Sequence, residues 1–171
     1  MDEHRLGLKP IRRRVWAPRG ARPVAQGHHR YKWLYVTAFV HPASGETFWY
    51  LTSRVSKLLF QELLALMARE AGAGRERILV LVLDNAGFHT PERLKVPDGI
   101  RLVYLPAYSP ELQPAEHLWG LLDEPLANRY FETLADLEAV LAERCRTLDQ
   151  DRTTLASRTG FHWWPNPIIR N

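Results

Sequence analysis

The sequence has little cysteine and no long apolar run, and both shortages exclude classes of protein. Its single cysteine, Cys145, cannot form an internal disulfide, and no Cys/His spacing typical of structural zinc is present. The longest apolar run, residues 78–83, is far shorter than the roughly 20 residues that a membrane helix needs. The chain starts Met1-Asp2-Glu3 and lacks the basic segment of a signal peptide. We therefore expect a soluble protein of the reducing cytoplasm.

What the chain does contain is enough apolar material for one compact domain, with 171 residues of which 46% are hydrophobic. Its net charge of +4 is unevenly spread. Residues 1–30 hold eight basic and two acidic residues, a net charge of +6, whereas residues 31–171 hold fifteen and seventeen, a net charge of −2. Such a basic arm favours contact with a polyanion such as nucleic acid, because neutralised phosphates release counterions. The alternative interpretation of the charge alone is a solvated surface segment.

The first half of the chain reads as an arm, a hairpin and a helix. Residues 1–30 lack helical periodicity and predict a loop with one short strand near Val15 and Trp16. Residues 31–40 and 47–51 are rich in β-branched and aromatic side chains, and turn residues separate them, so we expect an antiparallel hairpin with a five-residue connection. Ser56 is a good N-cap for an amphipathic helix that ends near Gly72.

The second half predicts a sheet with covering helices. Residues 78–83 are apolar without alternation, which is typical of a strand buried on both faces, and residues 101–105 predict a further strand. Residues 114–122 look helical with Pro114 at the first position, and Thr133 caps another helix. The elements together predict a mixed α/β domain over residues 1–148, with residues 1–30 as its basic arm and residues 149–171 as a C-terminal tail.

Two carboxylates stand where helices and strands begin or end. Asp84 follows the apolar run and should emerge at the carboxyl end of a buried strand, where open α/β sheets place their ligand sites. Taken alone, Asp84 is also ordinary turn chemistry before Asn85. Glu116 falls in the first turn of its helix, where simple charge complementarity with the helix dipole would explain it. Glu111 competes for the same role, and we prefer Glu116 because a helix holds its position better than a Pro-flanked loop.

Four sequence blocks, taken together, favour a functional role for Asp84 and Glu116. They are residues 2–8 (DEHRLGL), 14–20 (RVWAPRG), 83–89 (LDNAGFH) and 105–116 (LPAYSPELQPAE). In this order they resemble the catalytic core of DDE-type transposases of the bacterial insertion-sequence branch related to mariner. The resemblance covers residues 2 to about 145. It implies a ribonuclease-H-like fold, a mixed sheet flanked by helices, and the cleavage of DNA at transposon ends followed by strand transfer into target DNA.

The resemblance also implies a site. The carboxylate triad would be Asp2, Asp84 and Glu116, holding two Mg²⁺ or Mn²⁺ ions with Asp84 between both metals. Such ions prefer oxygen ligands, and a pair of them can activate the attacking oxygen and stabilise the leaving one. Asn85 and His89 would be auxiliary: Asn85 orients Asp84 or makes the turn, and His89 contacts phosphate, supports the metal ligands or caps a helix.

Basic and aromatic residues of the arm are candidates for contacts with DNA. Phosphate contacts beside the site are expected from Arg12, Arg13, Arg14, Arg19 and Arg22. Trp16 either stacks on a base or packs under the arm, and we favour packing. We also expect core positions for Trp33, Phe48, Trp49 and Trp119.

The resemblance implies partners: transposon terminal inverted repeats and target DNA, a second copy of the chain during synapsis, a separately encoded helix-turn-helix portion, and no membrane. The location would be the bacterial cytoplasm, at the nucleoid.

One departure concerns the start of the chain. The family's first Asp lies within or at the end of the first core strand, whereas only Met1 precedes Asp2 here. We therefore expect most of that strand to be missing and this chain to be poorly active. A misassigned start, a second overlapping frame and a decayed fragment all account for it. The alternative functions are a truncated, non-catalytic DNA-binding remnant and a related nuclease unconnected with transposition.

Overall fold

A computed structural model describes residues 1–24, 26–27, 30–89 and 94–161. In chain order its elements are β1 (Asp2–Gly7), β2 (Trp33–His41), β3 (Glu46–Thr52), α1 (Lys57–Glu70), β4 (Leu79–Leu83), β5 (Ile100–Tyr104), η1 (Pro110–Leu112), α2 (Glu116–Leu122), η2 (Glu124–Leu126), α3 (Leu134–Gln150) and α4 (Arg152–Thr159). The fold contains both β-strands and α-helices, which confirms the predicted mixed α/β class. None of the helices among the described residues is long and apolar enough to cross a membrane.

The first three strands form an antiparallel sheet in the order β1-β2-β3. Glu3 lies opposite Thr37, and Thr37 lies opposite Tyr50. The predicted hairpin is therefore present, although His41 pairs with Glu46, so that four residues and not five connect its strands. Gly45 in this connection has a positive φ of 70°, and a Cβ there would lie 2.0 Å from the carbonyl oxygen of Arg152. Only glycine fits this close approach.

The second sheet consists of β4 and β5, which run parallel and place Leu83 opposite Tyr104. The expectation that β4 is buried on both faces is wrong. Leu83 is fully buried, but 64% of Val80 is exposed to solvent. The reason is that α1 covers only one face of β4, and no helix of the described chain covers the other. Apolar composition without alternation thus does not distinguish a strand covered on one face from one covered on both.

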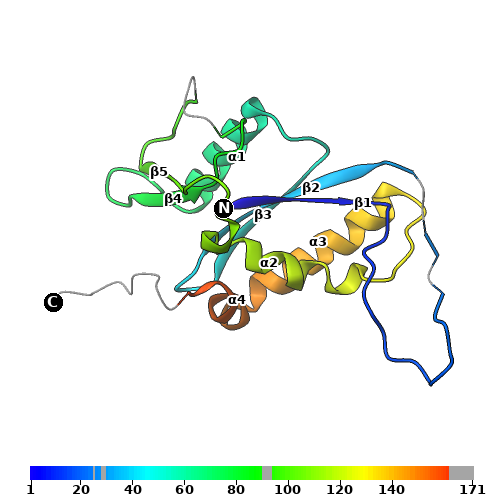
Figure 1. Cartoon of the computed structure of the whole chain (residues 1–171). Helices are drawn as coiled ribbons and strands as arrows, with labels where there is room; N and C mark the ends of the chain where they lie inside the picture. The colour runs from blue at the N-terminus through cyan, green and yellow to red at the C-terminus, as the bar shows by residue number, and fades with distance from the viewer. Residues whose placement is uncertain (25, 28–29, 90–93, 162–171) are drawn as a thin grey trace.

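Helices cover both faces of the β1-β2-β3 sheet, as Figure 1 shows. One apolar core joins this sheet to α2, α3 and α4, and includes Val36 and Ala38 of β2. The other joins it to α1, β4 and β5, and includes Phe39 of β2. Successive side chains of a strand point to opposite faces, so that β2 contributes to both cores. The N-caps of α1 and α3 are the predicted residues Ser56 and Thr133.

The N-terminal segment differs from its prediction. A strand forms at β1 immediately after the first residue, and it pairs with β2 along its whole length. The expectation that most of the first strand is missing is therefore corrected, because the six residues that begin with Asp2 form a strand of their own against β2. The strand expected near Val15 and Trp16 does not form, and both side chains are exposed. The Met1 ammonium donates a hydrogen bond of 2.9 Å to the carbonyl oxygen of Val82, which sets the beginning of β1 beside β4.

The segment expected to be a tail contains ordered structure. α3 extends through Asp149 to Gln150, and α4 follows it directly. Leu155 of α4 is fully buried in the core beside α2 and α3. The rule of helical periodicity missed α4 because it is only eight residues long and carries few apolar side chains. The Trp163-Trp164-Pro165 sequence lies outside the described residues, and the domain boundary at residue 148 stays a prediction.

Candidate active site

A cavity of about 390 Å³ lies where the beginning of β1, the end of β4 and the beginning of α2 meet. Asp2, Asp84 and Glu116 all line it, together with Asn85 and residues of the loop between β5 and α2. The structure thus brings three acidic residues from distant parts of the sequence to one cavity. Glu111, the competing candidate for the third carboxylate, lies on η1 and does not line it.

Asp2 reaches the cavity from the face of β1 that turns towards α2. Its Oδ2 accepts a hydrogen bond of 2.8 Å from the indole N–H of Trp119. Burial raises the pKa of Asp2, and the hydrogen bond from Trp119 acts in the opposite direction because it favours the ionised carboxylate. Trp119 is buried as expected, but it also holds a site residue, whereas Trp33 is 41% exposed and not in the core.

Asp84 stands directly after β4, and its side chain is half exposed. Oδ1 accepts a hydrogen bond of 3.1 Å from the backbone N–H of Ala86, and lies 2.6 Å from Nδ1 of His89. The first contact is a turn of the kind that Asp favours, and the second is a side-chain contact that fixes the carboxylate. Both contacts use Oδ1, so that Oδ2 is the oxygen left to a ligand of the cavity as far as the described residues go.

Asn85 does not orient Asp84. Its side-chain N–H donates a hydrogen bond of 2.6 Å to the carbonyl oxygen of Leu105, which follows β5. The bond joins the carboxyl ends of the two parallel strands and so shapes the floor of the cavity. Of the two roles considered for Asn85, the structural one at the turn matches this geometry.

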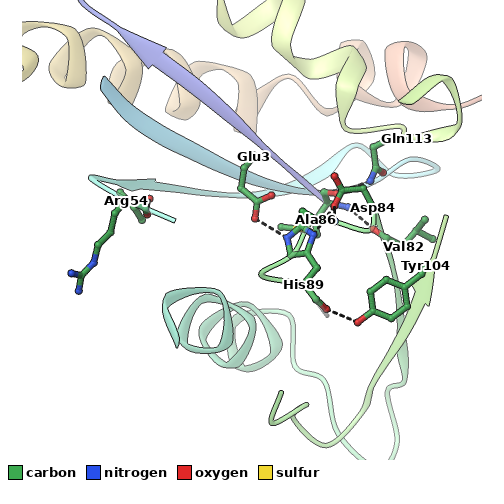
Figure 2. A network of polar contacts seen from close by, with 10 residues as sticks. Glu3, Arg54, Val82, Asp84, Ala86, His89, Tyr104 and Gln113 are labelled. Carbon is green, nitrogen blue, oxygen red and sulfur yellow. Dashed lines mark hydrogen bonds and ion pairs between the residues drawn. The ribbon is translucent and has the colours of Figure 1, made fainter. Parts of the chain in front are cut away.

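His89 is completely buried, which excludes a phosphate contact or a surface position for its ring. Its Nε2 lies 3.1 Å from Oε1 of Glu3, and its Nδ1 contacts Asp84 (Figure 2). Burial alone would lower the pKa of His89, but the hydrogen bonds and charges of Glu3 and Asp84 outweigh it and raise the pKa above its ordinary value. The ring thus supports the carboxylate of Asp84, and the role of Asp84 as a metal ligand stays a prediction.

Glu116 begins α2 and has more freedom than the two aspartates, since it is exposed. Burial, followed by the negative charge of Asp2 and a hydrogen bond between the two carboxyl groups, raises the pKa of Glu116, and the charge of Asp84 adds to this. Burial is thus the largest cause of the raised pKa, and the negative charges of Asp2 and Asp84 add a repulsion that a bound cation would relieve.

The donors in the cavity fit a hard divalent cation. They are carboxylate oxygens, and the amide oxygen Oε1 of Gln113 is buried nearby with no hydrogen-bond partner in the part of the chain that is described. The carboxylates are not arranged as a complete coordination site: within the described residues no three His, Cys, Asp or Glu side chains lie close enough together to hold a metal ion. Since Mg²⁺ keeps several waters, ligation by a few carboxylates suffices.

Comparison with known proteins decides the family. The family model described as DDE superfamily endonuclease matches residues 1–138. The chain belongs to this family. A protein of Sinorhizobium fredii (strain NBRC 101917 / NGR234), "Uncharacterized protein y4pE/y4sA", is 38% identical over 106 residues, which are 61% of this chain and 77% of that protein.

Solved structures show the fold of this DDE superfamily member. The Mos1 strand transfer complex matches with a TM-score of 0.62 at 20% identity, over 92% of this chain and 51% of that one. The Mos1 mariner paired end complex with Mn matches with a TM-score of 0.63 at 19% identity, over 93% and 52%. The chain therefore spans about half the length of the Mos1 chains. The likeness confirms the expected ribonuclease-H-like fold.

The arginines of the basic arm follow β1, whereas the candidate carboxylate Asp2 stands at its first position. A strand of six residues spans roughly 20 Å. The arginines are all exposed, and Arg13 donates a hydrogen bond to the carbonyl oxygen of Gly120. Trp16 is also fully exposed, so the expectation that it packs under the arm is wrong. Contacts of the arm directly beside the carboxylates do not follow from this geometry.

Sequence reasoning missed several residues of the site. Trp119 donates a hydrogen bond directly to the candidate carboxylate Asp2. Glu3 contacts His89, which in turn contacts the candidate carboxylate Asp84. Tyr108 lines the cavity almost fully exposed, with a positive φ of 59° that is unusual outside glycine. The alternation of Asp2 and Glu3 was the one signal for Glu3, since adjacent strand residues must face different neighbours.

Proposed function

We propose that this chain is the catalytic domain of a DNA transposase, which cleaves phosphodiester bonds at transposon ends and transfers the ends into target DNA. The observation that carries the proposal is the meeting of Asp2, Asp84 and Glu116 at one cavity in a fold like that of Mos1. Membership of the DDE superfamily endonucleases supports nuclease chemistry.

The chain's own residues would bind and orient the cofactor and the DNA. Asp84, Asp2 and Glu116 would hold two Mg²⁺ or Mn²⁺ ions. The ions would supply activation of the attacking oxygen and stabilisation of the leaving one. In cleavage, a water oxygen bonds to phosphorus while the bond from phosphorus to the 3′-oxygen breaks. In joining, the released 3′-hydroxyl oxygen would bond to a target phosphorus while the bond from that phosphorus to the target's own 3′-oxygen breaks, which leaves a 3′-hydroxyl on the target strand.

The arm would contact phosphates away from the scissile bond. Its arginines are exposed to solvent, and the segment that carries them follows the end of β1 opposite to Asp2. The partners would be the terminal inverted repeats and the target DNA, with two copies of the chain in the synaptic complex and a separately encoded helix-turn-helix portion to recognise the ends. The Mos1 neighbours are themselves described as strand transfer and paired end complexes.

Nicking of supercoiled plasmid DNA in Mg²⁺ or Mn²⁺ tests the proposal. We expect Asp84→Asn and Glu116→Gln to abolish nicking and to retain DNA binding, while Glu111→Gln behaves as the unchanged chain. Nicking that persists in Asp84→Asn would place the activity elsewhere. Joining of a pre-cut oligonucleotide with a free 3′-hydroxyl to plasmid separates a transposase from a nuclease that only cleaves.

The second candidate is a non-catalytic DNA-binding remnant. It is favoured by one observation, that the described residues contain no ready group of three metal ligands. DNA binding without nicking by either the unchanged chain or Asp84→Asn would support it.

A further inference from the structure

Asp2 and Glu3 are neighbours in the sequence but serve opposite faces of β1. Asp2 turns towards α2, where it contacts Trp119, whereas Glu3 turns towards the segment after β4. The Glu3 side chain is only 9% exposed, and its Oε1 lies 3.1 Å from Nε2 of His89. A carboxylate has thus been carried into the interior on the face of the sheet that does not bear Asp2.

The ring of His89 links Glu3 to Asp84. Each ring nitrogen contacts one of the two carboxylates, at 3.1 Å to Glu3 and at 2.6 Å to Asp84, as Figure 2 shows. Contacts on both sides fix the plane and the direction of the imidazole. Packing adds to this, because the rings of Phe60 and Phe88 lie 4.5 and 4.4 Å from it between centroids.

The backbone of His89 is held as well. Its carbonyl oxygen accepts a hydrogen bond of 2.7 Å from the hydroxyl of Tyr104, and its N–H donates one of 2.8 Å to the carbonyl oxygen of Ala86. Ring and backbone therefore have one position each. The short contact with the ring therefore fixes Oδ1 of Asp84, a residue that lines the cavity.

A buried Glu–His pair is an expensive way to stabilise a fold. Removing charged groups from water costs several kcal/mol for each ion, and well-packed apolar side chains of similar volume often stabilise as well or better. Metal ligands, in contrast, depend strongly on the groups behind them that orient them. The pair is therefore better explained by its effect on Asp84 than by its contribution to stability.

We propose that Glu3 is a positioning residue for Asp84 and acts through His89. The proposal deepens the proposed function and rests on it, since it assigns to Glu3 the orientation of a carboxylate that would hold the divalent cation. Glu3 itself does not line the cavity with Asp84. It sets the ring of His89, and the ring sets which oxygen of Asp84 faces the cavity.

Binding of Mn²⁺ alone, measured by electron paramagnetic resonance on the full chain, tests the proposal without DNA. We expect Glu3→Ala to weaken Mn²⁺ binding about tenfold. Glu3→Gln should retain most of the affinity, because its amide oxygen accepts the same hydrogen bond from Nε2. Glu62→Gln on the exposed face of α1 is the matched control and should bind as the unchanged chain does. Thermal unfolding of each variant separates lost binding from lost folding.

A second substitution tests whether Glu3 works through His89. In His89→Asn, the side-chain amide can replace Nδ1 towards Asp84 but cannot reach Glu3. Adding Glu3→Ala to this variant should have no further effect on Mn²⁺ binding, since coupled residues are not additive. Unchanged Mn²⁺ affinity in Glu3→Ala would overturn the proposal, and so would a full further loss in the double variant or an equal loss in Glu3→Gln.

Nuclear magnetic resonance of the histidine side chains keeps the test separate from the proposed function. Ring N–H protons of His89 should be observed in the unchanged chain and lost to solvent exchange in Glu3→Ala. If neither the unchanged chain nor Asp84→Asn binds Mn²⁺, the proposed function fails, and this spectrum still decides the positioning. Ring N–H signals that persist in Glu3→Ala would then overturn it.

Discussion

The indole N–H of Trp119 donates a hydrogen bond of 2.8 Å to Oδ2 of Asp2, across 117 positions of sequence. The indole is held in turn by His4, whose ring stacks on it at 5.0 Å between centroids and 15° between planes. His4 Nε2 lies 3.0 Å from Oδ1 of Asp123, which follows α2. α2 thus contributes Glu116 to the cavity and also fixes the orientation of Asp2.

Replacing Trp119 by Phe should separate these two contributions. Trp119→Phe keeps an aromatic ring in the core but removes the N–H donor, and we expect nicking to fall about tenfold while stability falls by about 1–2 kcal/mol. Trp49→Phe is the matched control, because the Trp49 indole donates to Thr47 on β3, away from the cavity. Equal effects of both substitutions on nicking would show that the bond to Asp2 has no special role.

The basic arm should act through phosphates. We expect the triple substitution of Arg12, Arg14 and Arg19 by Ala to weaken DNA binding and to reduce the slope of log K against log salt concentration by about 0.9 for each phosphate contact removed. Fluorescence anisotropy of a labelled duplex at several salt concentrations measures this slope. Arg146→Ala changes an exposed arginine that pairs with Glu143 on α3 and should leave the slope unchanged. An unaltered slope in the triple variant would make the arm a solvated segment.

Glu116 should cost stability when no cation is bound. Its pKa is raised in the folded chain, so the unfolded chain ionises first as the pH rises above the ordinary value of 4.5, and stability falls until the folded-state pKa is passed. Glu116→Gln should therefore raise the melting temperature at pH 7.5 and leave it unchanged near pH 3.5. Addition of Mn²⁺ should stabilise the unchanged chain more than this variant.

Scanning calorimetry at both pH values, with and without Mn²⁺, checks the prediction for Glu116. Glu111→Gln, on η1 outside the cavity, is the control for loss of a negative charge in the same region. A melting temperature of Glu116→Gln below that of the unchanged chain at pH 7.5 without metal would contradict the raised pKa of Glu116 in the folded chain.

α4 should be part of the folding unit. Leu155 is fully buried against α2 and α3, and we expect Leu155→Ala to destabilise the chain by about 2–5 kcal/mol in urea unfolding. Leu58→Ala on the exposed side of α1, where 65% of the side chain is accessible, should change stability by less than about 0.5 kcal/mol. An equally small effect at Leu155 would return residues 149–159 to the status of a tail.

Features with a local physical cause could be predicted from the sequence. Ser56 and Thr133 cap their helices through their own side chains. The turn after β4 could be predicted because Asp84, a residue that favours turns, directly follows the apolar run. The gathering of Asp84 and Glu116 at one cavity also has a simple origin, since one stands at a strand end and the other at a helix beginning. Side chains at the ends of neighbouring strands and helices can reach the same cavity.

Features that depend on the tertiary partner could not be predicted. Glu3 and His89 are 86 positions apart, and nothing near either residue in the sequence indicates that they meet. The exposure of Val80 depends on which face of β4 α1 happens to cover. Trp16 and Trp119 have the same composition argument for burial, yet one is fully exposed and the other buried, because only Trp119 lies on a helix packed on the sheet.

The register of β1 against β2 has a consequence for the site as a whole. Glu3 lies opposite Thr37, and a slip by one residue would exchange the faces of Asp2 and Glu3 and detach both from Trp119 and His89. The end of β1 opposite to Asp2 packs closely against the residue before β2. A Cβ at Gly7 would lie 2.6 Å from the carbonyl oxygen of Lys32, and the backbone N–H of Leu8 donates a hydrogen bond to this same oxygen. A side chain at position 7, remote from the carboxylates, would therefore disturb the alignment that decides which acid faces which side of the sheet.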